Sequence, residues 1–141
     1  MRSAAILLLS FLSSTAIAGQ CDVPGATNPD VTQENVQETI CVRGWTKKVR
    51  PSLHVTTLLK RQLLPSGHSV REFELDHCIP LELGGHPYAN ENLWLQEWSG
   101  PCGAYAKDHT ENFLRSLVCS GLLSLKEAQE RVMNWCKTEA R

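Results

Sequence analysis

The residues best suited to chemistry are Asp76 and His77, which are adjacent and follow an alternating polar and apolar stretch, residues 71–75. Such alternation predicts a half-buried strand, so the pair lies at its end, where the backbone can turn and bring both side chains to one site. A carboxylate can hold a divalent metal ion, and an imidazole titrating near neutrality can take a proton from water. The pair therefore suits metal-assisted hydrolysis of a phosphodiester bond.

A connection rich in turn residues separates this pair from a second short strand, predicted over residues 92–96. Pro80 and the dipeptide Gly84-Gly85 are placed to shape a tight loop behind the site. Asn92 opens the second strand, and its side-chain amide can either brace this loop or orient the imidazole of His77. Asn92 is therefore a third candidate for the site.

The order Asp-His-x-x-Pro-x-x-x-Gly-Gly, followed by Asn-Leu before a helix, resembles the HNH endonuclease motif of the ββα-metal (His-Me finger) superfamily over about residues 71–118. A looser similarity along the rest of the chain is to exported HNH-like proteins. The resemblance implies that His77 is the catalytic general base, that Asp76 is a metal ligand and that Asn92 orients the base. It also implies one divalent metal ion, with Mg²⁺ favoured and Mn²⁺ or Zn²⁺ as alternatives.

The chain departs from the motif at its third residue, usually His or Asn on the following helix, because Pro101 and Cys102 stand at that spacing. The nearest substitutes are Asp108, His109 and Glu111. Asp108 and Glu111 are three residues apart and share a helix face, so Glu111 or Asp108 is preferred over His109 as the further metal ligand. Lys107 and Glu111 are also spaced for an ordinary helical ion pair.

The formal net charge is −1, but the charges are unevenly distributed. Residues 42–71 contain no Asp or Glu. Because phosphate attraction depends on local charge, this basic segment predicts a nucleic-acid-binding surface, although a solvated basic face would have the same composition. Trp45, close to two lysines, is a candidate for stacking on unpaired bases. The candidate phosphate contacts are Arg43, Lys47, Lys48, Arg50, Lys60, Arg61 and Arg71.

Capping residues and hydrophobic spacing predict four helices around the two strands, and hence a small single α+β domain with a ββα-metal (HNH) core flanked by helices. The first helix runs from the Asp30 capping box to about residue 39, and residues 44–51 form a loop or short extended piece. Ser52 caps a second helix with an apolar face. The third covers residues 104–118 with Phe113 and Leu114 facing inward, and Ser124 caps the fourth.

Residues 1–18 have the charged, apolar and small-residue order of a secretory signal peptide. An N-terminal helical segment (19–70), the HNH-like core (71–118) and a C-terminal helix (119–141) then form one domain. Six cysteines fit disulfides in a secreted or periplasmic protein. One possible pairing is Cys21–Cys41, Cys78–Cys102 and Cys119–Cys136; a Cys78 thiolate ligand is the less favoured alternative.

The sequence thus predicts an exported, metal-dependent HNH-type endonuclease, monomeric and with no membrane contact in its mature form. Its substrate is nucleic acid, with DNA favoured and RNA possible, cut with little sequence preference because nothing resembles a base-reading module. The alternative is a disulfide-stapled secreted binding protein on an inactive HNH scaffold. A zinc hydrolase acting on another substrate is weaker, since no second histidine follows at ligand spacing.

Overall fold

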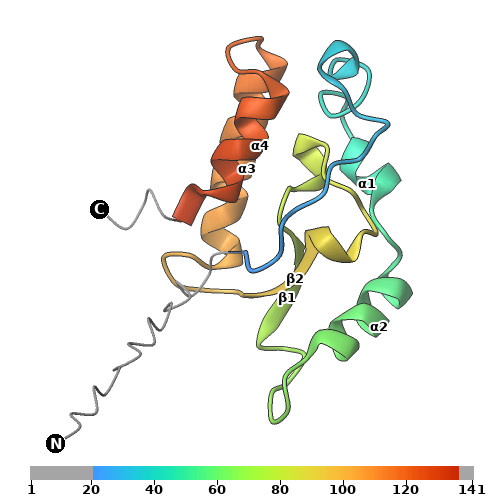
Figure 1. The fold of residues 1–141 in the computed structure, drawn as a ribbon, viewed down its shortest axis with the longest axis vertical. Coiled ribbons are helices and arrows are strands. Elements are labelled where there is room, and N and C mark those ends of the chain that lie inside the picture. Colours follow the sequence, from blue (N-terminus) through green and yellow to red (C-terminus); the bar gives the residue numbers. More distant parts are fainter. Residues whose placement is uncertain (1–20, 137–141) are drawn as a thin grey trace, which may run out of the picture.

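A two-stranded antiparallel sheet lies at the centre of the computed structural model, which describes residues 21–136 (Figure 1). Helices α3 and α4 lie on one side of the sheet, and α1 and α2 lie on the other. The predicted signal peptide falls outside the described residues. The elements are α1 (Trp45–Val49), α2 (Leu53–Leu63), β1 (Phe73–His77), β2 (Leu93–Glu97), α3 (Ala104–Cys119) and α4 (Leu125–Met133).

The two predicted strands pair with each other, and they do so antiparallel. Leu75 lies opposite Leu95, and His77, the last residue of β1, lies opposite Leu93. Asp76 and His77 are therefore the last two residues of their strand. The prediction of a small α+β domain with the candidate pair at a strand end is confirmed.

Local capping signals set the beginnings of two helices. The hydroxyl oxygen of Ser52 accepts from the backbone N–H of Val55 at the start of α2. In the same way Ser124 accepts from the N–H of Glu127 at the start of α4. Each contact satisfies an N–H that has no partner within its helix, so both predicted starts are confirmed.

The N-terminal helix predicted to residue 39 is wrong, since only a 3₁₀ turn, Gln33–Asn35, forms there. The Asn35 side chain accepts from the N–H of Thr32 and donates to the carbonyl of Asp30, which holds the chain in turns. The predicted loop after Gly44 is also wrong, because α1 begins there. Gly44 takes a left-handed conformation, φ 88°, that lets the chain enter this short helix sharply.

The disulfides are Cys21–Cys78, Cys41–Cys119 and Cys102–Cys136, so each expected pair is wrong. The expected pairs favoured neighbouring segments of the sequence. The observed pairs span separations of 57, 78 and 34 residues because they connect segments that only the tertiary fold brings together. Cys78 is consequently oxidised and offers no thiolate to a metal ion.

The core lies between α3, α4 and the irregular N-terminal segment, with Ile40, Leu83, Val118 and Val132 among its most buried residues. On α3 the inward face carries Lys107 and Glu111 followed by Leu114 and Val118. Phe113, predicted to face inward, is 61% exposed. The apolar residues of α2 are not enclosed either, since none of residues 53–63 is buried.

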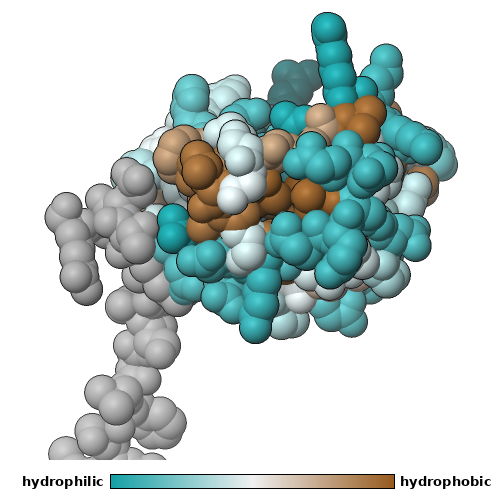
Figure 2. Space-filling view, turned by 90° about the horizontal axis from the view of Figure 1, so that it is seen from above, coloured by the Kyte–Doolittle hydropathy of each residue, from teal (hydrophilic) through white to brown (hydrophobic). Residues whose placement is uncertain are grey.

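The surface seen from above is mainly hydrophilic, with hydrophobic residues in the middle of this face and a smaller group near its upper right edge (Figure 2). The most exposed large apolar side chains of the described region are Leu53 and Leu122, at 83% and 75%. Among residues 21–136, no helix combines the length and apolar character that crossing a bilayer would require.

Replacement of Gly85 by alanine tests the tight loop between the strands. An added Cβ would lie 1.7 Å from the carbonyl oxygen of Ile79, so the backbone must move. We expect Gly85→Ala to lower the free energy of unfolding by about 3 kcal/mol or more. Gly44→Ala is the control: its Cβ meets nothing within 4 Å, so only the left-handed backbone costs energy, about 1–2 kcal/mol. Equal denaturant midpoints for the two variants would contradict this account of Gly85.

Candidate functional site

A buried ammonium group stands at the centre of the site. Lys107 is 1% exposed, and its Nζ lies 2.7 Å from Asp76 Oδ2 and 2.5 Å from Glu111 Oε1. The same nitrogen donates to the backbone carbonyl of His77 at 2.8 Å. An ammonium has three donors, and all three are used. Lys107 therefore joins the end of β1 to the middle of α3.

The charges of this group balance only in part. Burial alone would lower the pKa of Lys107, but the Asp76 and Glu111 carboxylates outweigh it and raise that pKa. Lys107 is therefore charged at neutral pH. Burial raises the pKa of Glu111 to about 7 against the opposing Lys107 charge. The sequence predicted the ion pair between Lys107 and Glu111, but gave no sign that Asp76 shares the ammonium.

The imidazole of His77 is 5% exposed, and its Nε2 lies 3.1 Å from the carbonyl oxygen of Pro87. Because a carbonyl only accepts, Nε2 must carry the hydrogen, which leaves the lone pair of a neutral ring on Nδ1. Burial lowers the pKa of His77, while the bond to Pro87 opposes that shift in part. The ring is thus held in one tautomer, neutral and able to accept a proton.

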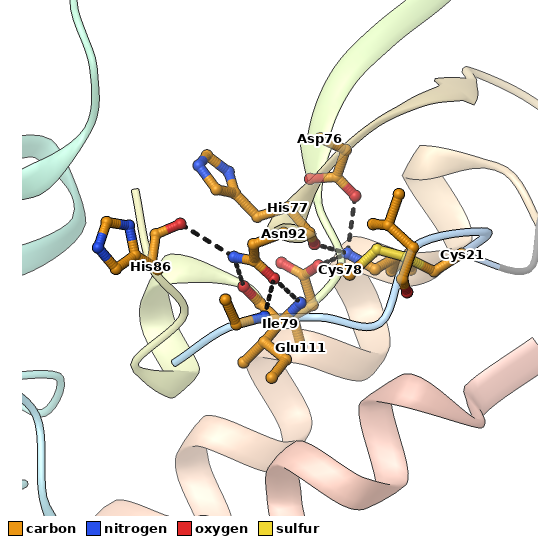
Figure 3. Close-up of a disulfide and its surroundings, with 11 residues drawn as sticks. Cys21, Asp76, His77, Cys78, Ile79, His86, Asn92 and Glu111 are labelled. Carbon is orange, nitrogen blue, oxygen red and sulfur yellow. Dashed lines mark hydrogen bonds and ion pairs between the residues drawn. A yellow bond between two sulfur atoms is a disulfide. The ribbon is translucent and has the colours of Figure 1, made fainter. Parts of the chain in front are cut away.

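Asn92 is fully buried and braces the loop that surrounds His77 (Figure 3). Its side-chain oxygen accepts from the N–H groups of Ala26 and Ile79, and its NH₂ group donates to the carbonyls of Ile79 and His86. These four bonds use the whole capacity of one amide. Of the two roles predicted for Asn92, the structure shows that it braces the loop. Its amide makes no direct hydrogen bond to the imidazole of His77.

Asp76 and His77 open onto a small polar cavity of about 140 Å³, which we name the acidic pocket. It is bounded by α1, β1, the turn after Pro80 and α3. A larger cavity, of about 780 Å³, lies between α3 and α4 and contains neither Asp76 nor His77. The larger of the two cavities is therefore not the one that holds the candidate catalytic residues. The residues lining the acidic pocket are Thr46, Arg50, Glu74, Asp76, His77, Pro80, Leu81, Glu82, Asp108, Glu111 and Asn112.

Two carboxylates of the acidic pocket, Glu74 and Glu82, were missed by the sequence reasoning. Burial, together with the charges of Asp76 and Asp108, raises the pKa of Glu74 to about 7. Burial also raises the pKa of Glu82. A signal for Glu74 was present, because residues two apart on a strand share a face and Glu74 precedes Asp76 by two.

The three predicted metal ligands, Asp76, Asp108 and Glu111, all line the acidic pocket, whereas His109 lines the larger cavity instead. Their oxygens are the donor type that Mg²⁺ prefers. Burial and the charge of Asp76 raise the pKa of Asp108, although the positive charges of Lys107, His109 and Arg50 oppose the shift. Within residues 21–136, however, no three His, Cys, Asp or Glu side chains are grouped closely enough to hold a metal ion. The donor chemistry fits a hard divalent cation, and Lys107 already engages two of the three ligands.

The basic segment, residues 42–71, does not converge on one point. Arg50 lines the acidic pocket, and Arg43 lines a neighbouring cavity. Lys48 lies 5.9 Å from the ring centroid of Trp45. Lys60 lies 5.7 Å from that of Trp98. Lys47, Arg61 and Arg71 are exposed.

The chain matches no protein-family model, no curated protein and no solved structure. The resemblance to HNH endonucleases accordingly rests on the residues of the chain itself.

Removal of the buried ammonium tests the ion network. We expect Lys107→Met to lower the free energy of unfolding by about 3–5 kcal/mol, because the buried Glu111 and the partly buried Asp76 lose their counter-charge. Burial raises the pKa of Glu111 in the folded state, and loss of the opposing Lys107 charge raises it further, so the ionisation of Glu111 destabilises the variant as pH rises. The loss should therefore be larger at about pH 8 than at about pH 5, as measured by urea unfolding.

The matched control is Lys126→Met, on the exposed face of α4. The Lys126 side chain is 87% exposed and lies 3.9 Å from Glu130. Its loss should change stability by less than about 0.5 kcal/mol at either pH. If Lys107→Met were as mild as this control, the ammonium would not be the link between β1 and α3.

Proposed function

We propose that the protein is an exported, metal-dependent HNH-type nuclease that hydrolyses phosphodiester bonds of nucleic acid, DNA in preference to RNA. The proposal depends on the residues that meet in the acidic pocket. A buried, neutral His77, with its tautomer fixed by the carbonyl of Pro87, lines the same pocket as Asp76 and Arg50. A base, oxygen donors for a cation and a guanidinium for phosphate thus meet in one small cavity.

In this proposal Nδ1 of His77 takes the proton from the attacking water. The bond from Nε2 to Pro87 keeps the ring in the required tautomer, and it can strengthen as the ring gains positive charge. Lys107 stabilises the carbonyl of His77 and the carboxylate of Asp76, and so fixes both residues at the strand end. Arg50 binds a phosphate oxygen at the mouth of the pocket.

A cation is needed because the acidic pocket by itself would repel a phosphodiester. Lys107 neutralises one of the two carboxylates that it contacts, and Asp108 adds further negative charge, as do Glu74 and Glu82 to the extent that they are ionised. Asp108, which Lys107 does not contact, and Asp76, whose side chain is more exposed than that of Glu111 (19% against 10%), would hold a Mg²⁺-type ion. When bound, such an ion offsets the negative charge that develops on the phosphate.

The rest of the proposal concerns place and substrate. Three disulfides fit an oxidising compartment, which supports export as a secreted or periplasmic protein. The side of the molecule that carries α1 and α2 also carries the basic segment, next to the acidic pocket. Such a surface holds the phosphate backbone and gives little preference for sequence.

A second candidate is a secreted nucleic-acid-binding protein on an inactive HNH scaffold. It is favoured by one observation: the Lys107 ammonium lies between Asp76, which the resemblance gives to the metal ion, and Glu111, one of the two preferred substitutes for the missing ligand. Binding of nucleic acid without metal-stimulated cleavage would support this candidate.

The nuclease proposal is tested with the purified protein on plasmid DNA and on RNA, with Mg²⁺ or Mn²⁺ and with an EDTA control. His77→Ala should lower the cleavage rate by about 10²–10⁴-fold, because it removes the proton acceptor. His54→Ala is the control on α2, where His54 is exposed, and it should cleave at the wild-type rate. Wild-type protein that leaves every substrate intact, or an active His77→Ala, would refute the proposal.

A separate experiment decides between the two proposed helix ligands. Asp108→Asn should raise the Mn²⁺ concentration for half-maximal cleavage, and for half-saturation in an EPR titration, by at least about tenfold. Glu111→Gln should raise it less, since Lys107 already engages Glu111. Glu130→Gln, exposed on α4, is the charge control. A larger effect at Glu111 than at Asp108 would reverse the assignment.

A further inference from the structure

A second cavity adjoins the acidic pocket and is lined by groups suited to one nucleotide. It has a volume of about 270 Å³ and shares the lining residues Thr46 and Glu82 with the acidic pocket, so the two cavities are neighbours. The residues that line it include Arg43 from the basic segment, Arg115 from α3, and Trp45.

The three side chains are held differently. The Nε of Arg115 donates to the carbonyl of Ile40 at 2.7 Å, which fixes the guanidinium against the N-terminal segment. Trp45 is half-buried and packs against the core along one side. The ammonium of Lys48 lies over the indole ring, 5.9 Å from its centroid, so a base that stacks on this face must displace the exposed Lys48 side chain. Arg43 is exposed and extends the cationic surface outward.

We propose that this cavity binds the nucleotide next to the cleaved phosphate, and that the base it takes is unpaired. This inference rests on the proposed nuclease function, because a cleaved phosphate exists only if the protein is a nuclease. Guanidinium groups bind phosphate oxygens, and an indole offers a flat face on which any base can stack. In a duplex the faces of the bases are already covered by their neighbours, so only an unpaired strand can use Trp45.

Glu82 gives the cavity its inner boundary. Burial raises its pKa, and the Arg115 charge opposes that shift, so Arg115 and the carboxylate are close enough to interact. A phosphate is therefore expected at the Arg43 side of the cavity rather than beside Glu82. The preferred substrate is then single-stranded nucleic acid, or the unpaired end or loop of a duplex.

The test measures binding in EDTA on a His77→Ala background, so that cleavage plays no part. The probes are a fluorescein-labelled oligo(dT) of about ten nucleotides and its duplex with oligo(dA), followed by anisotropy. Trp45→Leu keeps an apolar side chain against the core and should weaken single-strand binding on the order of ten- to hundredfold. Duplex binding should change less than about twofold, and Trp45→Phe should keep most of the affinity.

Arg43→Gln provides a second measurement that does not depend on folding, because Arg43 is exposed. It should weaken binding of both probes and reduce the salt slope by about one. Lys126→Gln is the matched charge control and should leave single-strand binding unchanged. Equal losses for strand and duplex in Trp45→Leu, or no loss at all, would overturn the proposal. So would an unchanged salt slope in Arg43→Gln.

The two proposals fail in different ways. If the EDTA measurements come out as expected but wild-type protein cleaves nothing with Mg²⁺ or Mn²⁺, the binding cavity stands and the nuclease function falls. If wild type cleaves DNA while Trp45→Leu and Arg43→Gln bind and cleave as well as it does, the nuclease stands and the cavity assignment falls.

Discussion

One buried ammonium holds together the two elements that carry the candidate site. Lys107 comes from α3, and its three acceptors are Asp76, the carbonyl of His77 and Glu111. A charge taken out of water is stable only where it is fully paired and hydrogen-bonded, which this group achieves with one contact for each N–H. The position of β1 relative to α3, and with it the shape of the acidic pocket, depends on this contact.

The second constraint is the loop after β1, which must hold the His77 ring through a backbone carbonyl. The side-chain amide of Asn92 supplies hydrogen-bond partners for backbone groups of Ala26, Ile79 and His86 in this irregular part of the chain. Gly85 allows the chain to pass against Ile79 where no side chain would fit. The disulfide from Cys78 fixes the same loop to the N-terminal segment. The position of the His77 imidazole thus depends on Asn92, Gly85 and the Cys78 disulfide, which take no part in the proposed reaction.

Features that a few neighbouring residues determine could be predicted from the sequence. The Ser52 and Ser124 caps, the alternation that ends at His77 and the helix that begins at Ala104 each follow from local backbone chemistry. The resemblance to the HNH motif also gathered Asp76, His77 and Asn92, which do lie together. The first helix failed for a local reason as well, because the side chain of Asn35 competes for the backbone bonds a helix would need.

Long-range features could not be predicted, because their partners are chosen by the tertiary fold. The expected disulfides pair cysteines that are close in the sequence. The entropic cost of closing a loop grows only slowly with its length, so a long separation does not exclude a pairing. The spacing of Lys107 and Glu111 predicts an ordinary helical ion pair but does not indicate whether the pair is buried. Only Asp76, 31 residues away, explains why both are buried. The inward face of α3 therefore begins with charges, and the apolar Phe113 lies outside it.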